Sequence, residues 1–150
     1  MLQHIQKRIP GTATTSSVTL GISTVPTSSD GDSLIDYSIS ITPRRPDSTL
    51  RVGLFIPFGV TTVTGAGVRF ALFRSGELNA FFATTTVFNS NQSISLEASL
   101  PADGGAPITI LTRWGVSSGA AYLNRSSTVS SYFGGNVMAS LLSVQELASN

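Results

Sequence analysis

The feature that most constrains the fold is a strand, a turn and a second strand between residues 67 and 82, with the sequence GVRFALFRSGELNAFF. Apolar side chains recur at every second position of the first half, at Val68, Phe70 and Leu72. This period of two is that of a pleated β-strand, and the small, polar residues 75–77 favour a tight turn. The segment therefore predicts a β-hairpin whose second strand begins near Leu78.

The same alternation recurs along much of the chain. Residues 33–42 place four apolar side chains on one predicted inward face: Ile35, Tyr37, Ile39 and Ile41. Residues 12–22, 50–60, 93–100, 108–115 and 136–147 are further predicted strands, separated by Gly, Pro, Ser and Asn. Pro57 lies inside one of them and indicates an edge or a bulge. With about nine or ten short strands and no helical periodicity, the chain is predicted to be an all-β, antiparallel jelly-roll sandwich.

Length and composition narrow the possible functions. The 150 residues suit one domain, with residues 1–11 as an N-terminal arm or first strand and residues 12–150 as the sandwich. Charged residues make up only 11% and the net charge is +1, so the positive field needed to bind nucleic acid is missing. The absence of cysteine excludes disulfides and thiolate chemistry. No export signal and no apolar run of about 18 residues is present, which predicts no membrane insertion.

Titratable groups do not converge on a catalytic centre. His4 is the only histidine, and the eight acidic residues are scattered through loops and strands. A catalytic triad would have to be built around His4, which is better interpreted as a polar residue of a terminal strand. Asp30, Asp32 and Asp36 surround a glycine as in some calcium loops, but the later ligands are missing and a turn is favoured. We therefore predict no enzyme activity, no cofactor and no metal.

Two other motifs carry little weight. Trp114, Tyr122 and Tyr132 would form a sugar-stacking platform if all were exposed, but Trp114 shares the predicted inward face of its strand. Asn91 and Asn124 begin glycosylation patterns that, without an export signal, are interpreted as accidental.

Four blocks of the sequence carry a resemblance to a known family. They are QHIQKRIPGTATTSSVTLG, PTSSDGDSLIDYSISITPRRPDSTLRV, VRFALFRSGELNA and YFGGNVMASLLSVQEL. Together they resemble the small jelly-roll domains of tailed-phage fibre and virion proteins, which are related in shape to the complement and tumour-necrosis-factor trimers. The resemblance implies a homotrimer located on the virion, made in the host cytoplasm, that serves as a fibre head, a head fibre or a capsid decoration.

The residues themselves suggest where such a protein would make contacts. Apolar side chains at predicted outward positions are candidates for the trimer interface: Phe55, Phe73, Phe81, Phe82 and Leu142. The short N-terminal segment is expected to bind other virion proteins through Leu2, His4, Ile5, Lys7 and Arg8. Two small, polar, glycine-rich loops are candidates for contact with a host-surface glycan or protein, through Thr61, Thr62, Thr64, Ser117, Ser118 and Tyr122.

Two other function classes remain open. A carbohydrate-binding module or lectin would show an exposed aromatic platform and bind glycans as a monomer. A small icosahedral coat protein would also use a jelly roll, but it ranks third because Lys7-Arg8 is the only basic cluster near the N-terminus.

Overall fold

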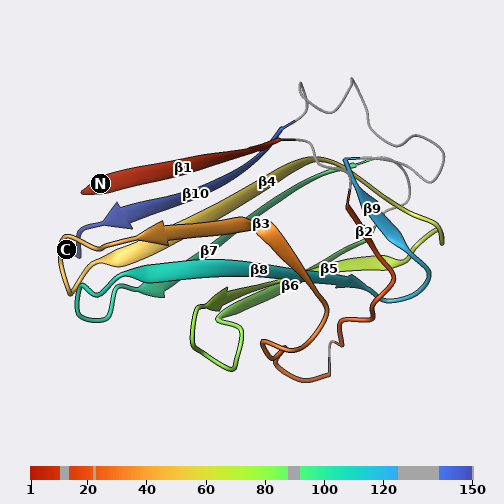
Figure 1. Cartoon of the computed structure of the whole chain (residues 1–150), viewed down its shortest axis with the longest axis horizontal. Helices are drawn as coiled ribbons and strands as arrows, with labels where there is room; N and C mark the ends of the chain where they lie inside the picture. Colours follow the sequence, from red (N-terminus) through yellow and green to blue (C-terminus); the bar gives the residue numbers. More distant parts are fainter. Residues whose placement is uncertain (11–13, 22, 88–91, 125–138, 150) are drawn as a thin grey trace.

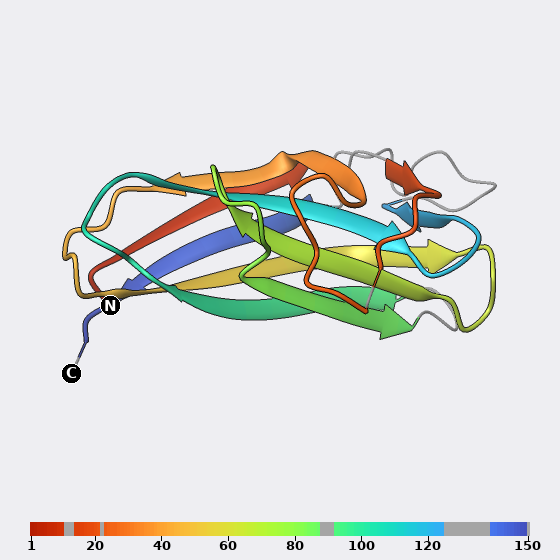
Figure 2. The same ribbon diagram turned by 90° about the horizontal axis from the view of Figure 1, so that it is seen from below.

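The computed structural model of the chain is a sandwich of two antiparallel β-sheets containing ten strands (Figure 1). It describes residues 1–10, 14–21, 23–87, 92–124 and 139–149. Figure 2 shows the two layers from a direction at right angles to that of Figure 1. The all-β, two-sheet class predicted from the alternation is confirmed.

Four long strands form the first sheet, in the order β1 (Gln3–Pro10), β10 (Ala139–Leu147), β4 (Thr49–Thr61) and β7 (Gln92–Pro101). The short strands β9 (Ala121–Leu123) and β2 (Thr14–Ser16) extend this sheet beside the end of β4. The second sheet has the order β3 (Asp32–Ile41), β8 (Ile108–Val116), β5 (Gly67–Arg74) and β6 (Phe82–Val87). Every connection between the eight long strands except the β5–β6 hairpin passes from one sheet to the other, which is the jelly-roll arrangement.

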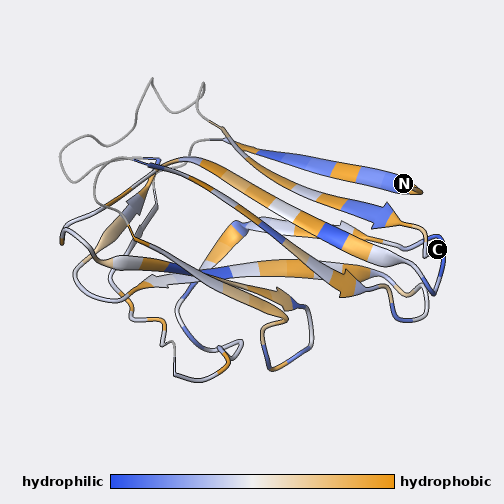
Figure 3. Cartoon of the chain, turned by 180° about the vertical axis from the view of Figure 1, so that it is seen from behind, coloured by the Kyte–Doolittle hydropathy of each residue, from blue (hydrophilic) through white to orange (hydrophobic). Residues whose placement is uncertain are grey.

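Side chains from the inner faces of both sheets form the core. Along β4, alternate residues are fully buried, and the hydropathy colours of Figure 3 alternate along the strands in the same way. The rings of Phe70 and Trp114 stack across neighbouring strands with centroids 6.3 Å apart. Trp114 is fully buried, which confirms that it is a core residue and leaves it outside any sugar-binding surface.

The central hairpin is confirmed with one shift. β5 and β6 pair antiparallel, and the turn includes a hydrogen bond from the Glu77 N–H to the Arg74 carbonyl, 3.1 Å. The second strand begins at Phe82 and not near Leu78. Residues 78–80 instead contact an earlier loop, where the Ser28 N–H donates to the Leu78 carbonyl and the Ala80 N–H to the Pro26 carbonyl.

The predicted inward position of Ile35 is wrong. Its side chain is 82% exposed, while Leu34 is buried in the core. The pairing of β3 with β8 shifts register between Ser33 and Ser38, and such a bulge reverses which alternate residues face inward. A second register shift lies between Ile56 and Gly59 of β4, which confirms the bulge indicated by Pro57.

The strand predicted for residues 12–22 is reduced to β2 in the described part of that segment. The chain then crosses the outer face of the second sheet, where Leu20 packs with Ala71 and Phe73. Gly115 permits this close approach, because a Cβ atom there would lie 2.7 Å from the Val18 carbonyl oxygen and 2.8 Å from the Leu20 Cβ. The covering segment explains why β5 is buried on both faces.

Candidate functional site

The two loops predicted to contact a host surface lie side by side at one end of the sandwich (Figure 1). We call residues 62–66 and 117–120 the loop pair. The Thr62 N–H donates to the Ala120 carbonyl at 2.8 Å, and the Ala120 N–H donates back to Thr62 Oγ1 at 2.9 Å. At the base of the pair, the Gly67 N–H donates to Ser117 Oγ at 2.8 Å. Segments 50 residues apart in sequence thus form one surface.

The geometry of the loop pair depends on glycine at its closest contact. Gly119 has a φ angle of +69°, and a Cβ atom there would lie 2.6 Å from Val63 Cγ2. Thr62, Thr64 and Ser118 are exposed, and no residue of the loop pair is charged. Such a surface offers hydroxyl and backbone hydrogen bonds, together with the exposed Val63 side chain, to whatever it touches.

The other predicted contact residues lie at the base of the loop pair. Thr61 is the last residue of β4, and Ser117, the first residue of the second loop, follows the last residue of β8. Tyr122 is half-buried in β9, where it pairs with Thr15 and Val60. Tyr132, the other aromatic considered for sugar stacking, lies outside the described residues.

Both chain ends lie at the opposite end of the sandwich from the loop pair (Figure 1). The Leu2 N–H donates to the Glu146 carbonyl at 2.7 Å, so the first residues and the end of β10 are side by side. The molecule is therefore directional, with its two termini at one end and an uncharged loop surface at the other.

The N-terminal segment is a strand of the first sheet and pairs with β10 from Gln3 to Pro10. Its candidate contact residues differ in exposure. His4 and Arg8 are exposed, Ile5 packs against the core, and Lys7 Nζ donates to the Ser38 carbonyl at 3.1 Å. Leu2 is half-buried and its carbonyl accepts a hydrogen bond from Arg44 Nη1 at 3.1 Å. Most of this segment is therefore occupied within its own domain.

The exposure expected of the interface candidates is wrong at two positions. Phe73 is covered by the segment that contains Leu20, and Leu142 faces the core from β10, so both are fully buried within one chain. Phe81 and Phe82 are partly buried against the core. Phe55 alone among the five is classed as exposed, at 39%, on the outer face of the first sheet. The expected trimer remains a prediction, and Phe55 is its strongest candidate residue.

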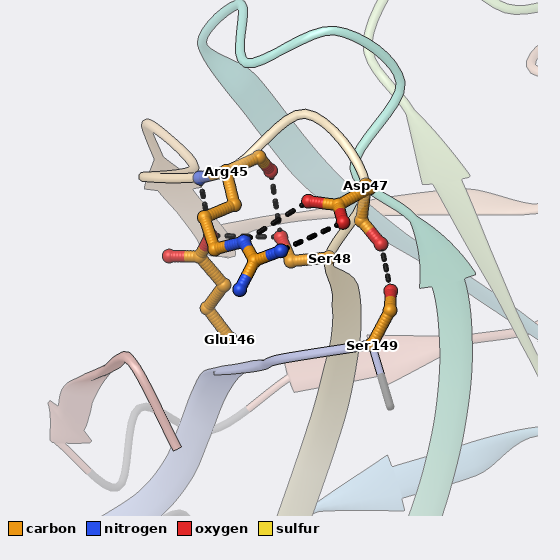
Figure 4. Close-up of polar contacts among 5 residues, drawn as sticks. All are labelled: Arg45, Asp47, Ser48, Glu146 and Ser149. Carbon is orange, nitrogen blue, oxygen red and sulfur yellow. Dashed lines mark hydrogen bonds and ion pairs between the residues drawn. The ribbon is translucent and has the colours of Figure 1, made fainter.

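A buried carboxylate, which the sequence analysis did not single out, lies at the end of the sandwich that contains both termini. The Glu146 side chain is fully buried on the inner face of β10. Its carboxylate accepts hydrogen bonds from the Arg45 N–H and from Ser48 Oγ at 2.7 Å (Figure 4). It also accepts hydrogen bonds from the Arg44 N–H and from Gln3 Nε2 at 2.8 Å. The same close-up shows the exposed ion pair between Arg45 and Asp47, 2.9 Å.

These donors determine the ionisation of Glu146. Burial raises the pKa of its carboxyl, but the hydrogen bonds from Arg44, Ser48, Arg45 and Gln3 outweigh burial and lower the pKa to about 2. Glu146 is therefore a fully hydrogen-bonded structural anion that ties the two terminal strands to the turn at residues 43–48.

Among the described residues, no three His, Cys, Asp or Glu side chains are grouped so as to hold a metal ion. The Asp30 carboxylate accepts hydrogen bonds from the Thr27 N–H at 2.6 Å and from Thr27 Oγ1, and these bonds lower its pKa. The interpretation of this segment as a turn is confirmed by the Asp30 N–H to Thr27 carbonyl bond, 2.9 Å.

Asn124 is buried, and its amide donates to the Tyr37 hydroxyl at 3.4 Å. It is therefore not presented as a glycan acceptor, and Asn91 lies outside the described residues. In the part of the chain that the structure describes, no helix is long and apolar enough to span a membrane.

The strand order identifies the fold as a jelly roll. Comparisons with known proteins give only weak similarities. No protein-family model matches the chain, and no curated protein matches its sequence. Among solved structures, it is similar to the VP2 subviral particle of infectious bursal disease virus, with 12% identity, a TM-score of 0.44 and coverage of 99% of this chain. A structure of T=1 particles derived from infectious bursal virus matches with 12% identity, a TM-score of 0.38 and 99% coverage.

The chain spans 38% and 37% of the lengths of those two proteins. Because both TM-scores lie below 0.5, the assignment of the fold depends on the strand order of Figure 1 and not on these similarities.

Proposed function

We propose that the protein is a non-enzymatic structural component of a virion and exposes its loop pair. The observation that carries this proposal is the directional jelly roll, with both termini at one end and an uncharged surface at the other. Jelly rolls with two four-stranded sheets form viral capsid and lectin domains, so the fold is compatible with the role. The sequence resemblance to phage fibre and virion domains favours the virion over the lectin.

In the first form of the proposal, the protein is a fibre head, a head fibre or a decoration, bound to the outside of a particle through the end where its termini lie. It would act as a homotrimer, and the loop pair would be available to a host-surface glycan or protein. The absence of charge on the loop pair favours a neutral ligand, because no side chain there would form an ion pair with an acidic or basic one.

In the second form, the protein is a subunit of an icosahedral shell. The observation that favours this form is that residues 3–10 are a paired strand of the sandwich and not a free arm reaching for another protein. A shell subunit needs no separate anchor, because its neighbours in the shell hold it through the sides of the jelly roll.

Electron microscopy of the chain expressed alone separates the two forms. Closed particles of uniform diameter would support the shell subunit, whereas small oligomers that bind to separately purified particles would support the decoration or fibre head. Antibody labelling of intact virions from the source of the chain tests the shared proposal. Label at regular positions on the particles is expected, and a protein recovered only outside the particles would contradict a virion role.

A glycan array on the same sample tests the lectin alternative. Glycan binding by a monomer that never joins a particle would favour the lectin. If the loop pair contacts a host surface, replacing residues 61–64 by alanine should leave incorporation into particles unchanged and weaken adsorption to host cells. A matched change away from both surfaces, Ser75→Ala in the exposed turn between β5 and β6, should alter neither measurement.

A further inference from the structure

Strand β6 lies at the margin of the second sheet with one of its edges open. Figure 2 shows it, in green, as the outermost strand of that layer. It pairs only with β5, and no backbone hydrogen bond joins its other edge to any described residue. An open edge presents a row of N–H and C=O groups that can pair with another chain.

Edge strands are normally protected by charged side chains, proline or a bulge. The three other long strands at the sheet margins carry such protection. It consists of Lys7, Arg8 and Pro10 on β1, of Asp32, Asp36 and a bulge on β3, and of Glu97 and Pro101 on β7.

β6 carries none of these features. Its sequence, FATTTV, contains no charge, no proline and no glycine, and its pairing with β5 runs without a register shift. The three consecutive threonines and the valine are residues with a high preference for strands. Val87 is 48% exposed, although it is the largest apolar side chain on the outer face of this strand.

We propose that β6 is a self-association site, at which it pairs edge to edge and antiparallel with β6 of a second copy of the chain. The two copies would be related by a twofold axis perpendicular to the sheet. Such an axis leaves the inner face of the sheet on the same side in both copies. Two residues directly opposite each other must therefore both point to the inner face or both point to the outer face. Placing the axis at Thr85 opposes Ala83 to Val87 and Thr84 to Thr86.

In this register, the side chains of β6 are complementary to those of β6 in the second copy. Val87 is covered by the Ala83 side chain of the other copy, and the remaining pairs are Thr–Thr, which can hydrogen-bond across strands. No like charges meet, and about six backbone hydrogen bonds join the copies. Self-complementarity is why the occupant is a second copy and not a foreign strand. The pairing does not rest on the proposed virion role, since it requires only the chain itself.

The test introduces a charge at the twofold axis. Thr85 is exposed, so Thr85→Lys and Thr85→Glu should each fold. We expect the parent protein to sediment as a dimer, or as a multiple of two, at micromolar concentration, and each variant to sediment with half the mass of the parent. Mixing the two variants should restore the dimer, because lysine then faces glutamate. Thr42→Lys, at an exposed position directly after β3, is the matched control and should sediment like the parent.

Hydrogen exchange gives a second measurement. Amides of residues 82–87 should exchange more slowly in the parent than in Thr85→Lys, with unchanged exchange in β3. The proposal would be overturned by a parent protein with an odd number of chains, by a Thr85→Lys variant that assembles like the parent, or by a mixture of Lys and Glu variants that keeps half the mass of the parent. None of these results would bear on whether the protein is found in virions.

Discussion

Replacing Glu146 by glutamine should destabilise the protein strongly at neutral pH and much less in acid. The change keeps the size of the side chain but removes its charge. One side-chain oxygen is replaced by an NH₂ group, which is itself a donor and would face the donors that Glu146 now accepts from. Those donors are the N–H groups of Arg44 and Arg45, the Ser48 hydroxyl and the Gln3 amide.

The size of the effect follows from the pKa. Lowering the pKa from 4.5 to about 2 means that the folded state favours the ionised carboxyl by about 3 kcal/mol. Glutamine loses this contribution and leaves a buried donor facing other donors. We expect the free energy of unfolding at neutral pH to fall by about 2 to 4 kcal/mol.

The dependence on pH has a defined sign. Because folding lowers the pKa of Glu146, its contribution is fully present above pH 4.5 and is lost as the pH falls from 4.5 toward about 2. Glutamine does not titrate. The difference between the parent and Glu146→Gln should therefore be largest at neutral pH and shrink steadily below pH 4.5.

Urea unfolding followed by fluorescence of Trp114, the single tryptophan, measures the difference at a series of pH values. Glu97→Gln is the matched control, since Glu97 pairs with Arg51 at 2.6 Å on an exposed surface. Its unfolding midpoint should stay close to that of the parent at neutral pH. Equal stability of the parent and Glu146→Gln, or a difference that does not change with pH, would refute the assigned role.

Three further substitutions test other parts of the structure. Phe55→Asp should shift assembled protein toward monomer in light scattering if Phe55 lies in a trimer interface, with Ser75→Asp, in the exposed turn between β5 and β6, as the control that leaves assembly unchanged. Gly115→Ala should lower the free energy of unfolding by about 1 to 3 kcal/mol, because the new methyl group displaces the segment that covers the second sheet. Thr112→Val should leave stability unchanged or raise it by up to about 1 kcal/mol in thermal unfolding, because the buried Thr112 hydroxyl has no hydrogen-bond partner among the described residues. A large loss of stability in Thr112→Val would contradict that environment.

Alternation predicted the inner faces of the regular strands well, because a half-buried strand must place every second side chain in the core. Leu50, Val52 and Leu54 of β4 and Ile94 and Leu96 of β7 are all buried as this rule requires. The fold class follows from the number of such strands, since only a sandwich or barrel can cover so many one-sided strands. The turn at residues 75–77 was also predictable, because its residue types favour a turn.

The rule failed where the structure depends on contacts between distant segments. A bulge in β3 reverses the alternation and exposes Ile35, and no local pattern distinguishes this strand from a regular one. Phe73 was expected to be exposed because its face of β5 is the outer one. That face is instead covered by a segment about 50 residues earlier, which contains Leu20. The two loops of the loop pair likewise form one surface through contacts between segments that are distant in the sequence.

Glu146 shows that a break in the pattern is itself a signal. Leu142 and Val144 mark the inward positions of β10, and the next inward position holds an acid. A lone carboxylate cannot be buried without donors, so an acid at that position requires hydrogen-bond donors packed against the strand. The segment TPRRPDS, which contains the basic pair and two prolines, is a turn that supplies such donors, and its N–H groups at Arg44 and Arg45 are the ones that bind Glu146. The backbone N–H groups of Arg44 and Arg45, and not their charged side chains, make the contact that holds the two termini of the sandwich together.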